Sequence, residues 1–228
     1  MEKIIVISLG GSLIVPNGGI DAVFLRRFQK LIFSHIRRRR RFIIICGGGK
    51  IARHYQQAVR AVGGKLTADD VDWLGIHATR LNAHLLRTIF RRVAHPSVVK
   101  NPTRPPQWKE SVLIAAGWKP GASTDYDAVL LARRFGAKTV VNLSNVSYVY
   151  DKDPAKYRSA RKLPDVSWKD FRKIVGNRWD PGANLPFDPV ASRLAEKLGL
   201  RVLMIKGNDW KSVDAALRGK KFKGTVIE

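Results

Sequence analysis

The chain has 228 residues, enough for one large or two small domains, and 45% hydrophobic with 26% charged residues exclude a disordered, collagen-like or coiled-coil protein. No apolar run approaches the roughly 18–20 residues of a membrane-spanning helix, and the one cysteine, Cys46, excludes a disulfide framework, so we expect no membrane partner and a cytoplasmic location. The formal net charge of +24 attracts polyanions such as nucleic acid, anionic membranes or phosphorylated small molecules, although charge alone does not favour nucleic acid over a merely solvated basic surface.

Continuous apolar runs rich in β-branched residues predict strands that are buried on both faces of a parallel sheet. The first of these runs is too short for a signal peptide and ends in glycines rather than a cleavage site, so we expect no signal peptide. In chain order, the predicted strands are Lys3–Leu9, Phe42–Cys46, Val112–Ala116, Thr139–Leu143 and Val202–Ile205.

Stretches with apolar residues at helical spacing lie between these strands. The alternation of strands and helices predicts an α/β fold. The predicted helices are Asp21–Arg40, Ile51–Val62, Val71–Val93, Asp125–Phe135, Trp168–Val175 with Ser167 as its cap, and Pro189–Leu198. Irregular segments are expected at 101–106 and 177–189.

Glycine-rich turns follow the first three predicted strands, at Gly10-Gly11, at Gly47-Gly48-Gly49 and at Gly117. Ligands of an open parallel sheet bind beyond the carboxyl ends of its strands, and helix N-termini offer free N–H groups to phosphate there. Lys50 and Arg53 add cations to the second turn. The pattern therefore predicts a phosphate-binding site.

Other sites find no support in the sequence. Lys50 is followed by Ile51, so no Walker A loop is formed, and no G-x-G-x-x-G follows the first strand. His77 and His84 share a helix face but lack further ligands, so we predict no protein metal site. Cys46 ends a buried strand and is interpreted as a packed thiol rather than a nucleophile.

Taken in order along the whole chain, a set of motifs resembles the amino acid kinase family, and within it the uridylate kinases of the archaeal type. The matching segments are 7–12 and 46–53, which carry the glycine loops, then 72–76, 79–83, 120–125, 144–154, 188–191 and 224–228. The resemblance implies a single three-layer α/β/α sandwich over residues 1–228 with a central, mostly parallel sheet. It also implies a UMP side in residues 1–117 and an ATP side in residues 118–228.

The resemblance implies two nucleotides that meet above the sheet. The ATP-binding positions would be Gly11, Ser12, Gly49 and Arg53 for the phosphates and Ser144, Asn145, Tyr150 and Asp153 for base and ribose. The UMP-binding positions would be Gly48, Asp72, Trp118, Lys119, Pro120, Gly121, Ala122, Ser123 and Thr124. Carboxylates suit hydroxyl groups, and backbone N–H and guanidinium groups suit phosphate.

The implied reaction is transfer of a phosphoryl group from ATP to UMP, with Mg²⁺ bridging the ATP phosphates. Because the UMP phosphate is already ionised, catalysis consists of in-line positioning and charge neutralisation. Lys50 and Arg53 are the candidate cations, and Asp188 is the candidate carboxylate that orients them, while Asp125 acts similarly or touches UMP. A solvated loop lysine and a helix N-cap remain the alternative interpretations of Lys50 and Asp188.

The chain departs from the family pattern at two places. Many members have a lysine just before the first glycine pair, where this chain has Ser8-Leu9, and Ser147-Tyr148 replaces Asp-Gly in the adenine loop. The missing lysine keeps open a nucleotide sensor or storage protein without transfer activity. Two further rivals are another small-molecule kinase of the same fold and RNA binding through the basic surface. The resemblance also implies a homohexamer.

Overall fold

The computed structural model describes residues 4–17, 19–176 and 185–228. Its main feature is a seven-stranded sheet in the order β3-β2-β1-β4-β8-β9-β7. The strands β3, β2, β1, β4 and β8 run parallel to one another, and β9 runs antiparallel to β8. These strands are β1 (Ile4–Leu9), β2 (Arg41–Cys46), β3 (Val112–Ala115), β4 (Thr139–Ser144), β7 (Asp165–Val166), β8 (Arg201–Lys206) and β9 (Thr225–Ile227).

All five predicted strands are present, and their side chains are buried on both faces of the sheet. Along β1, Ile5 and Ile7 belong to one core cluster and Val6 to the other. The prediction from continuous apolar runs is thus confirmed, because a strand with two covered faces needs no polar alternation.

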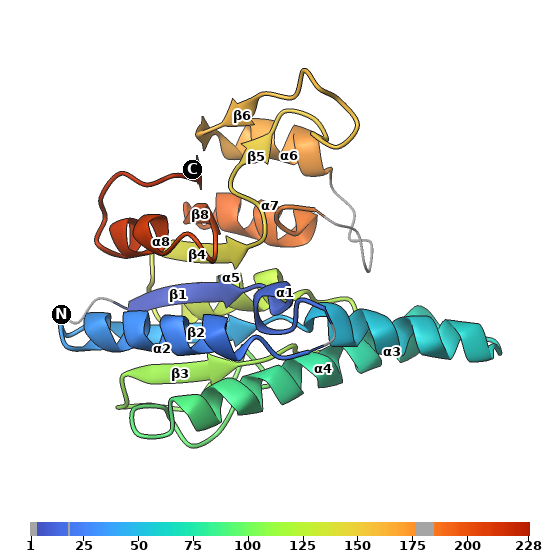
Figure 1. Cartoon of the computed structure of the whole chain (residues 1–228), viewed down its shortest axis with the longest axis horizontal. Coiled ribbons are helices and arrows are strands. Elements are labelled where there is room, and N and C mark those ends of the chain that lie inside the picture. The colour runs from blue at the N-terminus through green and yellow to red at the C-terminus, as the bar shows by residue number, and fades with distance from the viewer. Residues whose placement is uncertain (1–3, 18, 177–184) are drawn as a thin grey trace.

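Helices cover both faces and complete the predicted three-layer sandwich (Figure 1). Helices α1 (Gly11–Ile14), α2 (Ala22–Ile36), α4 (Ala68–Ile89) and α8 (Trp210–Leu217) cover one face, and α5 (Thr124–Arg134), α6 (Trp168–Val175) and α7 (Pro189–Lys197) cover the other. Helix α3 (Gly49–Val62) packs on α4, and together they extend beyond the sheet (Figure 1). None of the helices in the described ranges is long and apolar enough to span a bilayer.

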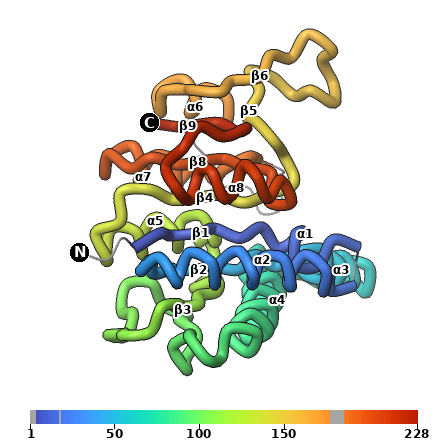
Figure 2. The backbone as a smooth tube through the Cα atoms, turned by 60° about the vertical axis from the view of Figure 1, so that its left-hand side comes forward, coloured from blue at the N-terminus to red at the C-terminus, as the bar shows by residue number. Residues whose placement is uncertain are grey.

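The structure adds short elements that the sequence did not indicate: α1, α8, β7, β9 and a two-stranded hairpin of β5 (Val149–Tyr150) and β6 (Lys162–Leu163). Figure 2 shows β9 and α6 beyond β8 at one end of the sheet, with α4 towards the other end. The segment 101–106 is irregular, as expected, whereas most of the predicted irregular stretch 177–189 lies outside the described residues.

Helix α2 ends at Ile36, four residues before the predicted end. The chain turns over Arg37–Arg40, and Arg39 adopts the left-handed conformation with φ 58°. Only the αR conformation continues a helix, so the arginine run belongs to a turn rather than to the last helical turn.

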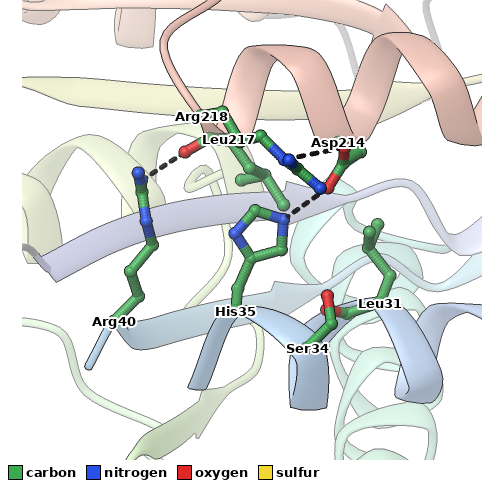
Figure 3. Close-up of polar contacts among 7 residues, drawn as sticks. All are labelled: Leu31, Ser34, His35, Arg40, Asp214, Leu217 and Arg218. Atoms are coloured by element: carbon green, nitrogen blue, oxygen red, sulfur yellow. Dashed lines mark hydrogen bonds and ion pairs between the residues drawn. The ribbon is translucent and has the colours of Figure 1, made fainter. Parts of the chain in front are cut away.

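A polar contact ties the C-terminal parts of α2 and α8 together (Figure 3). The buried His35 contacts Asp214 at 3.0 Å, and Arg218 contacts the same carboxylate at 2.9 Å. The guanidinium of Arg40 donates to the carbonyl of Leu217. The two helices that flank β1 and β8 on this face are thereby held in register far from the glycine turns.

Candidate functional site

The glycine turns meet at the carboxyl edge of the sheet because β2, β1 and β4 are neighbours. The N–H of Gly47 donates to Leu9 at 2.9 Å, and that of Gly10 donates to Leu143 at 2.8 Å. A Cβ atom on Gly11 would lie 2.0 Å from the nitrogen of Gly49, so only glycine permits this approach. The expectation that the strand ends share one edge is therefore confirmed.

A cavity of about 310 Å³ opens beside these turns, between α3, α4 and the start of α5. Nine residues assigned to the site from the sequence line it: Gly48, Gly49, Arg53, Asp72, Ala122, Ser123, Thr124, Asp125 and Asp188. The order of motifs along the chain had implied a convergence of distant segments, and the cavity brings together residues from position 48 to position 188.

The remaining assigned residues lie outside the lining of this cavity. Gly11 and Ser12 form the start of α1, against the second glycine turn. Lys50 stands in the first turn of α3, where its N–H donates to Val15 at 3.0 Å. The other residues that do not line the cavity are Trp118, Lys119, Pro120, Gly121, Ser144, Asn145, Tyr150 and Asp153.

The predicted adenine and ribose residues follow β4 and reach the β5–β6 hairpin. Ser144 ends β4, Asn145 is exposed, and Tyr150 ends β5. The carboxylate of Asp153 accepts from the N–H of Ala155 at 2.9 Å and so stabilises an exposed turn.

The segment Gly117–Gly121 begins at the cavity with Gly117, and side chains of α4 and α5 fix its backbone. The N–H of Gly117 donates to Thr79 at 2.8 Å, and the N–H of Gly121 donates to Asp72 at 2.9 Å. Arg80 donates to the carbonyl of Trp118 at 3.1 Å. This segment is thus held in place without a ligand, and one carboxylate oxygen of Asp72 is already engaged.

Asp125 lies at the centre of a polar network between the cavity and the sheet. Its carboxylate accepts from Ser8 at 2.8 Å, from Asn142 at 3.2 Å and from the N–H of Asp188 at 3.2 Å. Although the residue as a whole is only half-buried, the carboxyl group itself is enclosed by these partners, and its burial raises its pKa to about 7, with a further contribution from the charge of Asp188. Ser8 therefore contacts a carboxylate from the position at which many family members have a lysine.

Asp188 has two roles in the structure. Its side chain caps α7 by accepting from the N–H of Ala191, which confirms the interpretation as an N-cap, and it also lines the cavity. Burial raises the pKa of this carboxyl group as well. The helix cap thus holds a carboxylate at the site, beside Asp125.

Sequence reasoning missed Asp127, whose carboxyl group is nearly fully buried two positions after the cavity residue Asp125. One oxygen accepts from the N–H of Trp118 at 3.1 Å, and the other has no hydrogen-bond partner among the described residues. Burial raises its pKa to about 7. Only the fold brings Trp118 onto α5, so spacing gave no signal.

Sequence reasoning also missed cavity residues on α3 and α4, namely Gln56, Gly75, Ile76 and Thr79. Gln56 follows Arg53 by three positions, and Thr79 follows Asp72 by seven, so each shares a helix face with an assigned residue. This helical spacing was a usable signal.

The donor set suits an ion held chiefly by phosphate. The described residues contain no group of three or more His, Cys, Asp or Glu that could enclose a metal. Asp125 and Asp188, however, place two carboxyl groups close enough for one charge to raise the pKa of the other. Mg²⁺ commonly binds one or two carboxylates together with substrate phosphates, and these residues fit that pattern.

Comparison with known proteins gives a consistent result. The model of the amino acid kinase family matches residues 3–206. Proteins named uridylate kinase are 32% identical to this chain in Methanoculleus marisnigri, over 99% of this chain and 95% of the relative, and in Thermoplasma volcanium, over 100% and 99%. The crystal structure of uridylate kinase from Archaeoglobus fulgidus has a TM-score of 0.81 at 30% identity and covers 100% of both chains.

The UMP kinase structure from Bacillus anthracis, at 19% identity, has a TM-score of 0.79 over 99% of this chain and 96% of that one, and supports the fold alone. The chain belongs to the amino acid kinase family.

Proposed function

We propose that this chain is a UMP kinase, which transfers the γ-phosphoryl group of ATP to UMP and releases ADP and UDP. The observation that carries this proposal is the cavity at the carboxyl edge, where glycine turns, Arg53 and buried carboxyl groups converge. Relatives named uridylate kinase align with nearly the full length of this chain, which supports the same activity.

UMP is the proposed occupant of the cavity. Its volume of about 310 Å³ is at the small end for ligand sites and suits a nucleoside monophosphate. The backbone of Gly48 and the N-terminus of α3 face the phosphate, while the free oxygen of Asp72 accepts from ribose hydroxyl groups. The segment from Trp118 to Thr124 encloses the base and the phosphate.

ATP is the proposed occupant of the neighbouring surface over β1 and β4. Gly11, Ser12, Gly49 and Arg53 contact its phosphates. Its base and ribose lie against the residues that follow β4, namely Ser144, Asn145, Tyr150 and Asp153. The contact between the two glycine turns supports this arrangement, because the residues assigned to the donor phosphates then lie beside the cavity.

The chemical step forms a bond from a UMP phosphate oxygen to the γ-phosphorus and breaks the bond from that phosphorus to the bridging oxygen of ADP. No strong base is required, because the attacking oxygen is already ionised. Lys50 and Arg53 neutralise charge on the transferred group, and Asp188, together with Asp125, orients these cations. Asp125 and Asp188 would hold Mg²⁺ together with the ATP phosphates, and the ion would supply further charge neutralisation.

The finer assignments belong to the same proposal. A UMP kinase supplies UDP for pyrimidine nucleotide biosynthesis, so we place the chain in that process and in the cytoplasm. We also propose a homohexamer. Sedimentation of the purified protein tests the assembly directly, and a monomer would contradict it.

A coupled assay tests the activity, with ATP, Mg²⁺ and one acceptor at a time: UMP, CMP, AMP or acetylglutamate. We expect turnover with UMP to exceed that with each other acceptor. Binding of UMP without turnover would instead support the nucleotide sensor, which Ser8 in place of a lysine keeps open. Preferred turnover of acetylglutamate would support another small-molecule kinase.

A further inference from the structure

The topology gathers cations at the amino edge of the sheet, opposite the nucleotide cavity. In a parallel α/β fold, the strands begin where the helices end, so the residues after α2, α5 and α8 meet at this edge. Six exposed residues here, which we name the amino-edge cluster, are Arg37, Arg38, Arg39, Lys138, Lys220 and Lys221.

A cavity of about 980 Å³ lies beside this cluster. Lys138 and Lys220 line it, together with Arg40, Arg41 and Arg201. The cations that follow three different helices therefore face one shared hollow, although they are far apart in the sequence.

Among the described residues, no acidic side chain pairs with the amino-edge cluster. In contrast, Arg201 pairs with Glu228 at 2.6 Å and Arg218 with Asp214 at 2.9 Å (Figure 3). One or two cations at a helix end are explained by the helix dipole. Arg37, Arg38 and Arg39 exceed that need, whereas Arg40 and Arg41 donate to backbone carbonyl groups.

Arg39 gives an independent indication that the side chains matter at this edge. It is the one non-glycine residue of the described chain with positive φ, at 58°. Glycine adopts this conformation without the cost of about 1–2 kcal/mol that an L side chain incurs. The presence of an arginine at a position that favours glycine points to a role for its guanidinium group.

The surroundings of the cluster distinguish between kinds of polyanion. The exposed large apolar side chains of the described chain lie outside segments 37–41, 133–138 and 217–222, so nothing at this edge would insert into a membrane. The half-buried rings of Phe135 and Phe222 do line the cavity, and such rings stack on unpaired bases. Arginine also matches phosphate geometry better than lysine does.

We propose that the amino edge binds single-stranded nucleic acid, with its phosphates on the amino-edge cluster and a base in the adjoining cavity. The structure adds what net charge alone lacked: a cluster of cations at one edge, a cavity beside it and aromatic rings that line this cavity. This surface is separate from the nucleotide site, so the inference stands independently of the kinase activity.

Fluorescence anisotropy with a labelled 20-nucleotide single-stranded RNA of mixed sequence tests the proposal between 50 and 200 mM KCl, with UMP and a non-hydrolysable ATP analogue occupying the nucleotide site. The test variant carries R37E, R38E and K221E. The control variant carries R60E, K65E and K169E, which change the net charge equally at exposed positions elsewhere. Kinase activity and the melting temperature report that both variants are folded.

We expect the test variant to bind RNA at least about tenfold more weakly at 100 mM KCl and to lower the salt slope by about two, since each phosphate contact contributes about 0.7. The control should change affinity less than about twofold. R39G should weaken binding without lowering the melting temperature. The proposal would be overturned if both triple variants weakened RNA binding equally, or if the wild type bound no RNA at 50 mM KCl. It would also be overturned if equimolar inorganic triphosphate displaced all of the bound RNA, or if the protein bound phosphatidylglycerol vesicles and RNA did not release it from them.

Discussion

At the scale of single residues, the nucleotide site is distinguished by carboxyl groups that the fold buries at a cost. Asp125, Asp127 and Asp188 all have pKa values above the usual range, and burial is the main cause for each. An unpaired buried oxygen, such as that of Asp127, is unusual in a folded protein and calls for a reason. The other oxygen of Asp127 accepts from the N–H of Trp118, which directly follows the cavity residue Gly117 in the chain.

The raised pKa of Asp127 predicts a pH-dependent stability difference between the wild type and D127N. The folded wild type keeps a proton at pH values between about 4 and 7, where the unfolded chain has lost it, so this group lowers stability as pH rises through that range. D127N lacks the titration. Its free energy of unfolding relative to wild type should therefore rise between pH 4 and 7 and level off above 7.

Each pKa unit corresponds to about 1.4 kcal/mol, so we expect the relative gain of D127N to be at least about 1 kcal/mol, measured by urea denaturation across the pH range. D69N, at an exposed position, is the matched control. A flat difference curve for D127N would show that the Asp127 carboxyl titrates normally in the folded protein.

Arg53 offers a test of charge neutralisation at the cavity. It is exposed, lines the cavity and makes no ion pair within the described ranges, so removing it should barely change stability. Hydrogen bonds to charged groups contribute about 1.5–3 kcal/mol, so R53A should lower kcat/KM about 10- to 100-fold. R60A, two turns further along α3, should leave steady-state kinetics unchanged. A wild-type rate in R53A would remove the guanidinium from the proposed site.

At the scale of elements, the nucleotide site depends on two turns that touch through their backbones. The structure predicts that G11A displaces one turn, because the new Cβ would lie 2.0 Å from the nitrogen of Gly49 and 2.5 Å from the carbonyl carbon of Gly47. We expect a loss of about 2 kcal/mol or more in unfolding free energy, in the range of overpacked cores, together with loss of turnover.

G19A is the matched substitution for this prediction, because nothing lies within 4 Å of the Cβ that it adds. Thermal denaturation and the coupled assay compare the two variants side by side. If G11A has the same melting temperature as G19A and keeps its activity, the two turns are not in the contact that the structure describes.

The sequence predicted those elements whose apolar or capping residues form a clear pattern. Long runs buried on both faces predicted β1 and β2, and Ser167 correctly predicted the start of α6. Strand β9 has three residues, too few for a period to emerge, and helix α8 was missed although it is as long as α6 and Asp209 caps its start. The place of β9 depends on contacts made by the rest of the sheet, which no local pattern encodes.

The site divides in the same way. Residues that directly follow strands, such as Gly48 and Gly49, were predictable because strand ends meet at one edge. Asp127 was not, because its contact with Trp118 requires the chain to fold back over nine positions. Resemblance to a family supplied positions such as Asp72 and Asp188, where spacing alone gave no reason to choose them.

At the scale of the whole molecule, the two edges of one sheet carry different chemistry. The carboxyl edge combines backbone N–H groups, Arg53 and buried carboxyl groups, whereas the amino edge carries a cluster of cations beside the larger cavity. This polarity follows from parallel topology, which sends strand ends and helix starts to one edge and the opposite termini to the other. Substitutions at one edge should therefore leave the other intact.

The division of the carboxyl edge between two nucleotides leads to a prediction about Asp72. D72A removes both the proposed ribose acceptor and the acceptor for the N–H of Gly121, which lies in the segment that begins at the cavity with Gly117. We expect KM for UMP to rise about tenfold, on the order of one hydrogen bond to a charged group, while KM for ATP stays within about twofold. D72N keeps an oxygen for Gly121 and should fall between D72A and wild type. A selective rise in KM for ATP would mean that the donor, not the acceptor, occupies the cavity beside α4, and that the two halves of the site are exchanged.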